Sequence, residues 1–210
     1  MRSIAKLMKD WQFTGPNGVT TAVELPHTWN AKDGQDGGND YWRGCCTYCT
    51  RFAAPVYDPA QQQVWLQFEG VNASAAVLLN GQQLCTHDGG YSTFRAEVTE
   101  LLQAENQLTV RVDNSVNDRV YPQKADFTFY GGIYRDVSLL VVNKSHIALG
   151  HFGDTGVKIT PALQENSADI RVETLVEGSG TVTVELLDAE GRTVAKGEGE
   201  NASLHLDAPH

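Results

Sequence analysis

Short segments that alternate apolar and polar residues, each ended by a turn signal, recur along the whole chain. The stretch NQLTVRVDNS (106–115) is typical, because its leucine and valines stand at every second position and so predict a strand with one buried face. Helical spacing is limited to VTELLQAEN (98–106), where Thr99 is expected to cap a single helical turn. This pattern predicts an all-β fold and favours a β-sandwich or jelly roll.

Five further segments before residue 143 predict strands. The longest contains Asn80-Gly81 between two apolar runs, which is a strong hairpin signal. The last is apolar at successive positions, as expected of a strand that is covered on both faces. The segments are TYCTRFAAP (47–55), QVWLQFEGV (63–71), SAAVLLNGQQLCTHDG (74–89), YSTFRAEV (91–98) and YRDVSLLVV (134–142).

The character of the chain changes after NKSHIAL (143–149). Phe152 is the only aromatic residue after Tyr134, and four alternating strands follow, with DAEG (188–191) as a hairpin turn. We therefore expect a jelly-roll domain over residues 1–145 and an immunoglobulin-like β-sandwich over residues 146–210. Four or five strands are fewer than the seven of an immunoglobulin-like sandwich, so this second domain is expected to be incomplete.

The net charge of the chain is −10, which argues against a nucleic-acid or anionic-membrane partner because both select basic surfaces. No apolar run approaches the roughly 20 residues that span a bilayer. The start, MRSIAKLMKDWQF, lacks the apolar core of a signal peptide. We therefore expect a cytoplasmic protein, or a periplasmic one if a leader has been trimmed.

Three of the four cysteines crowd into CCTYC (45–49), where Cys46 and Cys49 have the C-x-x-C spacing of a zinc or redox site. A zinc site needs a second ligand pair, and the sequence offers none. A redox pair opens a helix after a strand, whereas TYCTRF has the pattern of a strand. The cysteines are expected to be buried or half-buried thiols, and no metal ligands are assigned.

Several separated motifs resemble one known family. Together they are similar to the N-terminal sugar-binding domain of glycoside hydrolase family 2, which includes β-galactosidases, β-glucuronidases and β-mannosidases. The resemblance extends over roughly residues 11–145, and the remainder is similar to the start of the immunoglobulin-like domain that follows in these enzymes. The motifs are VELPHTWN (23–30), DYWRGCCTYCTRF (40–52), FEGVNASAAVLLNGQQLCTHDGGYSTFRAEVTELL (68–102), NQLTVRVDNS (106–115) and DFTFYGGIYRDVSLL (126–140).

The resemblance implies a retaining glycosidase, a β-galactosidase in the first place, whose two catalytic glutamates belong to a (β/α)8 barrel outside this chain. No catalytic residue is therefore assigned here, and the chain alone is expected to be inactive. The implied partners are a β-galactoside or related glycoside, that barrel, and further copies of the full-length protein. No cofactor is expected, although a sodium or magnesium ion in the full-length enzyme is left open. The alternative is a stand-alone, lectin-like carbohydrate-binding module.

Three residues are candidates for contact with the sugar. Asp126 matches the family aspartate that precedes the GGIYRDV motif and contacts hydroxyl groups of the terminal sugar. A carboxylate suits that task because it accepts several charge-assisted hydrogen bonds. Asn39 and Asp40 lie in the polar loop DGQDGGNDYWRG (33–44), which in the family also approaches the active site. The structural alternatives are that Asp126 pairs with an arginine or caps a turn, and that the loop is simply solvated.

Other prominent residues have structural interpretations. Gly131-Gly132 is expected to form a sharp bend before the last strand of the jelly roll. Arg135 is expected to bind carboxylates of a neighbouring loop, and Asp113 and Asn114 are expected to form a turn. Four aromatic residues are assigned to packing rather than to a ligand platform, namely Trp65, Phe68, Phe94 and Phe129.

Overall fold

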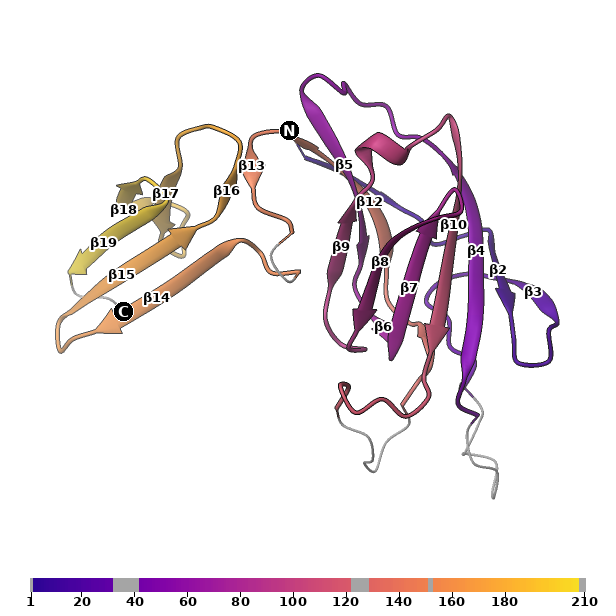
Figure 1. Cartoon of the computed structure of the whole chain (residues 1–210). Helices are drawn as coiled ribbons and strands as arrows, with labels where there is room; N and C mark the ends of the chain where they lie inside the picture. The colour runs from indigo at the N-terminus through magenta and orange to yellow at the C-terminus, as the bar shows by residue number, and fades with distance from the viewer. Residues whose placement is uncertain (1, 32–41, 122–128, 151–152, 208–210) are drawn as a thin grey trace. The chain divides into compact units, whose positions relative to one another are not determined.

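The computed structural model describes residues 2–31, 42–121, 129–150 and 153–207. These residues form 19 strands and one short 3-10 turn, with no α-helix among them, so the all-β prediction is confirmed (Figure 1). Contacts divide the chain into two units, Met1–Val142 and Asn143–His210. The described residues contain no helix that is long and apolar enough to cross a membrane.

The first unit is a jelly-roll sandwich of two main antiparallel sheets (Figure 1). One sheet has the order β1-β12-β5-β9, with strands β1 (Ser3–Lys6), β12 (Val137–Asn143), β5 (Gln62–Phe68) and β9 (Phe94–Glu97). The other has the order β3-β2-β4-β10-β7-β8, with strands β3 (Thr20–Val23), β2 (Trp11–Thr14), β4 (Cys45–Ala53), β10 (Glu105–Asp113), β7 (Ser74–Leu79) and β8 (Gln82–Asp88). A short pair joins β6 (Val71–Asn72) to β11 (Gly132–Ile133).

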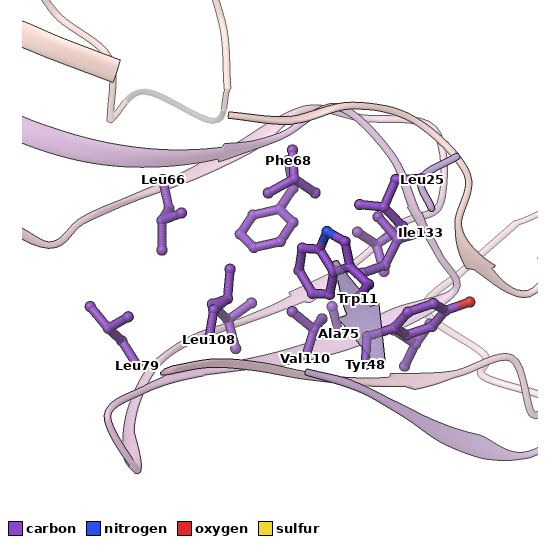
Figure 2. Packing of buried hydrophobic residues seen from close by; sticks show 14 of the residues in the cluster. Trp11, Leu25, Tyr48, Leu66, Phe68, Ala75, Leu79, Leu108, Val110 and Ile133 are labelled. Carbon is purple, nitrogen blue, oxygen red and sulfur yellow. The ribbon is translucent and has the colours of Figure 1, made fainter. Parts of the chain in front are cut away.

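The core of this unit lies between the two sheets. Figure 2 shows Leu66 and Phe68 of β5 opposite Leu108 and Val110 of β10, and all four side chains are fully buried. The alternation predicted for β10 is confirmed, because its inward residues are buried whereas Arg111 faces outward and is exposed. Fully burying one such side chain stabilises the fold by about 1.5–3 kcal/mol, so the two facing rows supply much of the stability of the unit.

Two predictions about local structure have opposite outcomes. The Asn80-Gly81 hairpin is confirmed, because it joins β7 to β8 and both of its turn residues have positive φ angles, 52° and 82°. The cap assigned to Thr99 is wrong. The turn η1 (Thr99–Leu101) has Val98 at its N-cap and no side-chain cap. The Thr99 hydroxyl bonds instead to Glu97 and to the backbone of Val64, because Thr99 is buried against β5.

Strand β12 is buried on both faces over Val137–Val142, as its continuous apolar run predicts. The four aromatic residues assigned to packing are all at least nine-tenths buried, which agrees with that assignment. The cysteines of β4 are free thiols. The expectation that they are buried or half-buried is confirmed for Cys46 and Cys49 but wrong for Cys45, which is exposed at the start of the strand. Burial raises the pKa of Cys46 to about 12, so this thiol stays protonated and unreactive.

The second unit consists of three small antiparallel sheets. Three buried residues, Val172, Ala202 and Leu204, form the centre of its core. The hairpin at 188–191 is confirmed, because Asp188 Oδ1 accepts the backbone N–H groups of Glu190 and Arg192. The immunoglobulin-like identity of this unit stays a prediction. The sheets pair β13 (His146–Ile147) with β16 (Val176–Glu177), β15 (Ser167–Thr174) with both β14 (Val157–Leu163) and β19 (Asn201–Asp207), and β17 (Thr183–Leu187) with β18 (Thr193–Glu198).

Candidate functional site

The three residues that the sequence singles out for sugar contact, Asn39, Asp40 and Asp126, lie outside the described residues. Their roles therefore stay predictions. The residues that flank them in the chain are described, and these flanks meet in one corner of the first unit. The described residues next to both candidate segments therefore lie in this corner.

A buried asparagine joins the flanks of both segments. Asn30 is fully buried, and its Nδ2 donates to the carbonyl of Trp42 at 2.9 Å, which ties the two ends of segment 32–41 together. Its Oδ1 accepts the backbone N–H of Gly131 at 2.8 Å. Gly131 lies just after segment 122–128, so one side chain holds both candidate segments at their bases.

A second buried asparagine completes the junction. Asn114 is 4% exposed, and its Nδ2 donates to Asn30 Oδ1 at 3.1 Å. Its Oδ1 accepts the backbone N–H of Gly44 at 2.9 Å. The Asn114 side chain is therefore bound to buried partners, a role that the sequence did not predict. Asp113 does form the expected turn, since its Oδ1 accepts the N–H of Ser115 at 2.8 Å.

The glycine pair fits the corner for two different reasons. A side chain at Gly131 would collide with the indole of Trp29 and would lie 2.6 Å from Asn114 Nδ2. Gly132 has a φ angle of 132°, which side-chain-bearing residues rarely adopt, and a Cβ there would lie 2.5 Å from the carbonyl of His27. The two glycines therefore allow the close approach that the asparagine junction needs.

Aromatic side chains surround the junction. The ring centroids of Trp29 and Trp42 lie 6.1 Å apart in an edge-on contact. The guanidinium of Arg43 lies 5.8 Å from the centroid of the Phe129 ring, which links the residues that follow the two candidate segments. The indole Nε1 of Trp29 is buried without a hydrogen-bond partner, an arrangement that costs stability.

A hydrogen-bonded tyrosine–histidine pair lies next to the corner. Tyr48 is fully buried, and its hydroxyl lies 2.7 Å from His27 Nδ1 in a hydrogen bond. Burial raises the pKa of Tyr48 and lowers the pKa of His27. Both side chains are therefore neutral near pH 7, and this pair positions the loop rather than carrying charge.

The residues after the bend are structural, although not in the way the sequence predicts. Arg135 was expected to bind loop carboxylates, but its guanidinium donates to the carbonyl oxygens of Tyr91 at 3.2 Å and Glu69 at 3.4 Å. The neighbouring Asp136 pairs with Lys6 Nζ at 2.5 Å. These contacts attach the start of β12 to the residue after β5, to the loop at 89–93 and to β1, because the guanidinium faces main-chain carbonyl groups of Glu69 and Tyr91.

A small hollow of about 20 Å³ lies in the described part of the corner, between Asn72, Asn114, Ser115 and Phe129. This volume holds about one water molecule and is far too small for a sugar ring. Its described lining includes no carboxylate, and no group of three potential metal ligands occurs among the described residues. The described residues of the corner therefore position the chain segments on either side of the candidate residues.

Comparison with known proteins identifies the family. Residues 35–163 match the family model described as glycosyl hydrolase 2 galactose-binding domain-like. The chain belongs to this family. It is 34% identical over 212 residues to a β-glucuronidase of Bacteroides fragilis, and 32% identical over 139 residues to a β-galactosidase of Thermoanaerobacter pseudethanolicus. These matches cover 96% and 62% of this chain, respectively, but only 30% and 18% of the relatives.

Solved structures of family 2 glycosidases share the fold. The crystal structure of an FMN-binding β-glucuronidase from Facaelibacterium prausnitzii L2-6 aligns with a TM-score of 0.92 at 34% identity and covers all of this chain. A putative β-galactosidase from Bacteroides fragilis aligns with a TM-score of 0.89 at 32% identity and also covers all of this chain. The chain corresponds to 34% and 36% of those chains, respectively, so it spans about a third of the length of its structural relatives.

Proposed function

We propose that the chain is the non-catalytic N-terminal part of a retaining family 2 glycoside hydrolase. In this proposal the catalytic (β/α)8 barrel belongs to the portion of the relatives that the chain does not span. The chain contributes sugar contacts to that active site from the segments that start at the asparagine junction. The observation that carries the proposal is the convergence of both candidate segments on Asn30 and Asn114.

The sugar that we propose first is a β-linked glucuronic acid. The β-glucuronidase relative at 34% identity supports this choice, since its match covers 96% of this chain. A β-galactoside, the sugar expected from the sequence, is the second candidate, and the relatives named as β-galactosidases support it. The two sugars differ at C6, which is a carboxylate in glucuronate and a hydroxymethyl group in galactose, and in the configuration at C4. Assays of the longer protein with p-nitrophenyl β-glucuronide and p-nitrophenyl β-galactoside therefore distinguish them.

Asp126→Ala in the longer protein tests the sugar contact. Charged hydrogen bonds to substrate are worth about 2–4 kcal/mol when lost in this setting, so kcat/KM is expected to fall about 30- to 1,000-fold with the melting temperature unchanged. The control is Glu24→Ala, which removes an exposed carboxylate elsewhere on the same unit. Unchanged kinetics in the Asp126 variant would remove the sugar-contact role.

The alternative function is a stand-alone carbohydrate-binding module. It requires a longer protein without hydrolase activity and a chain that binds galactose or glucuronate by itself through Asp126. Calorimetry of the 210-residue chain with each monosaccharide tests this directly. Hydrolysis by the longer protein together with loss of activity in the Asp126 variant would reject the module in favour of the enzyme.

A further inference from the structure

A second concave surface lies on the outer face of the six-stranded sheet. It is an open groove of about 860 Å³, with a floor formed by β7, β8 and β10 and one wall formed by the loop at 115–119. Small-molecule sites commonly have volumes of 300–1,000 Å³. All of its lining residues are described, and none of them belongs to segments 32–41 or 122–128.

Strand register places the floor side chains in two rows across the sheet. One row contains Cys45, Asp113, Ser74 and Asp88, which are paired in that order between neighbouring strands. The next row contains Thr47, Arg111, Ala76 and Thr86. Polar groups therefore line one edge of the groove, and a single arginine stands among small side chains beside them.

The polar edge is held in place before any ligand arrives. Asp88 accepts hydrogen bonds from Ser74 Oγ at 2.7 Å and from Asn117 Nδ2 at 2.9 Å, and its other oxygen lies 2.8 Å from Arg119 Nε. These bonds lower the pKa of Asp88, so it stays ionised. A fixed carboxylate loses little conformational entropy on binding, which favours its use as an acceptor for ligand hydroxyl groups.

Arg111 is the free donor of the groove. Its side chain is exposed, and the described residues provide it with no hydrogen bond or ion pair, although a guanidinium has five N–H donors. Thr47 and Ala76 flank it in the sheet, and Ala76 and Thr86 are small side chains that leave room for a ligand to approach its N–H groups. Val116, which is 70% exposed at the wall, offers an apolar contact next to these polar groups.

The charges of the groove select an uncharged ligand. Two arginines, Arg111 and Arg119, stand against three aspartates, Asp88, Asp113 and Asp118, which leaves a net charge of −1 on a chain whose net charge is −10. An anion would be repelled, and the absence of a three-ligand cluster among the described residues argues against a cation. Fixed carboxylate acceptors beside a free guanidinium donor suit vicinal hydroxyl groups, each of which both donates and accepts.

We propose that this groove binds a neutral oligosaccharide of two or three sugar units, with Arg111 as the principal donor and Asp88 and Asp113 as acceptors. The apolar faces of the sugar rings lie against Val116 and the alanine floor. This site is separate from the asparagine junction and does not depend on the proposed hydrolase activity. It would hold a glycan chain on the protein without cleaving it.

Titration of the 210-residue chain with neutral trisaccharides tests the proposal. The probes are β-1,4-linked galactotriose, cellotriose and mannotriose, with tri-galacturonate as the acidic comparison. At least one neutral probe is expected to bind at a single site with a dissociation constant of about 1 mM or tighter. Arg111→Leu is expected to weaken this binding at least about tenfold, the size of one lost charge-assisted hydrogen bond.

Arg51→Leu is the matched control, because Arg51 is an exposed arginine on the same outer face, in β4, and it pairs with Gln107 away from the groove. It should leave binding unchanged. Melting temperatures confirm that each variant is folded. Absence of binding by all neutral probes, equal loss in the Arg51 and Arg111 variants, or a tenfold preference for tri-galacturonate would each overturn the proposal.

Cys45 provides a second readout inside the groove. It is the exposed cysteine of the polar row, whereas Cys46 is buried. A bound trisaccharide is expected to slow the alkylation of Cys45 by iodoacetamide, as measured by peptide mass spectrometry. An alkylation rate that stays the same at saturating ligand would place the ligand elsewhere and overturn the assignment.

Discussion

At the scale of single residues, Asn30 shows how one polar side chain organises a corner. It satisfies a carbonyl, a backbone N–H and another amide, all of them buried. Asn30→Ala would leave these partners unpaired, and each unpaired buried group costs about 1–3 kcal/mol. We expect a loss of about 3 kcal/mol in the free energy of unfolding after partial rescue by water.

Urea denaturation of the Asn30 variant measures this loss. The control is Gln82→Ala, which shortens an exposed side chain at the start of β8 and should change stability by less than about 0.5 kcal/mol. A loss in the Asn30 variant as small as that of the control would contradict the junction.

Two histidines of the first unit make its stability depend on pH. Burial lowers the pKa of both His27 and His87. The unfolded chain, with a histidine pKa of about 6.5, therefore binds protons that the folded chain does not. The stability that the two neutral histidines contribute is complete above about pH 6.5 and is lost as the pH falls below it. The free energy of unfolding should therefore decrease as the pH is lowered from about 7.5 to 5.5.

His205 has the opposite sign, because bonds to Asp169 and Asp207 raise its pKa, and its exposed position makes the effect small. The measurement is urea denaturation at both pH values in a His205→Gln background. His87→Gln should flatten the decrease, because it removes one of the two titrating groups. Stability that rises on acidification in this background would contradict the prediction.

At the scale of elements, glycine substitutions at the bend before β11 and at an open turn distinguish the cost of steric contact from the cost of backbone strain. Gly131→Ala should cost more than about 2 kcal/mol, because the added methyl group meets Trp29 and Asn114 in a packed corner. Gly18→Ala is the comparison: its φ angle of 74° is strained for alanine, but nothing lies within 4 Å of the new methyl group, so it should cost about 1 kcal/mol. Thermal unfolding of both variants measures the difference, and an equal cost would mean that crowding at the bend is unimportant.

The strands were predictable from sequence because their signals are local. Strand β10 alternates apolar and polar residues, and the Asn80-Gly81 hairpin supplies its own turn chemistry. The junction was not predictable, because Asn30 and Asn114 are 84 positions apart and each looks like a turn residue by itself. Thr99 failed as a cap for the same reason, since its hydroxyl is recruited by β5 across the fold. The signals that were missed are long-range contacts, which no local pattern contains.

At the scale of the whole molecule, the two units differ in how much apolar surface they bury. Among the described residues, the first unit has a core cluster of 22 buried residues, whereas the cluster of the second unit contains three. Apolar burial contributes about 25 cal/mol per Å² to stability. The second unit therefore gains far less hydrophobic free energy to offset the conformational entropy that its strands lose on folding. The second unit should therefore open more readily than the first.

Hydrogen exchange on the 210-residue chain tests this difference with a matched pair of strands. Val110 and Val172 are both buried valines in a central strand with an antiparallel neighbour on each side, β10 in the first unit and β15 in the second. Because local opening free energies follow local burial, amides of β10 should exchange at least about 100-fold more slowly than those of β15. Both strands have a hydrogen-bonded neighbour on each side, so they differ mainly in the size of the core beneath them. Equal protection of their amides would mean that the second unit is stabilised by something other than its buried core.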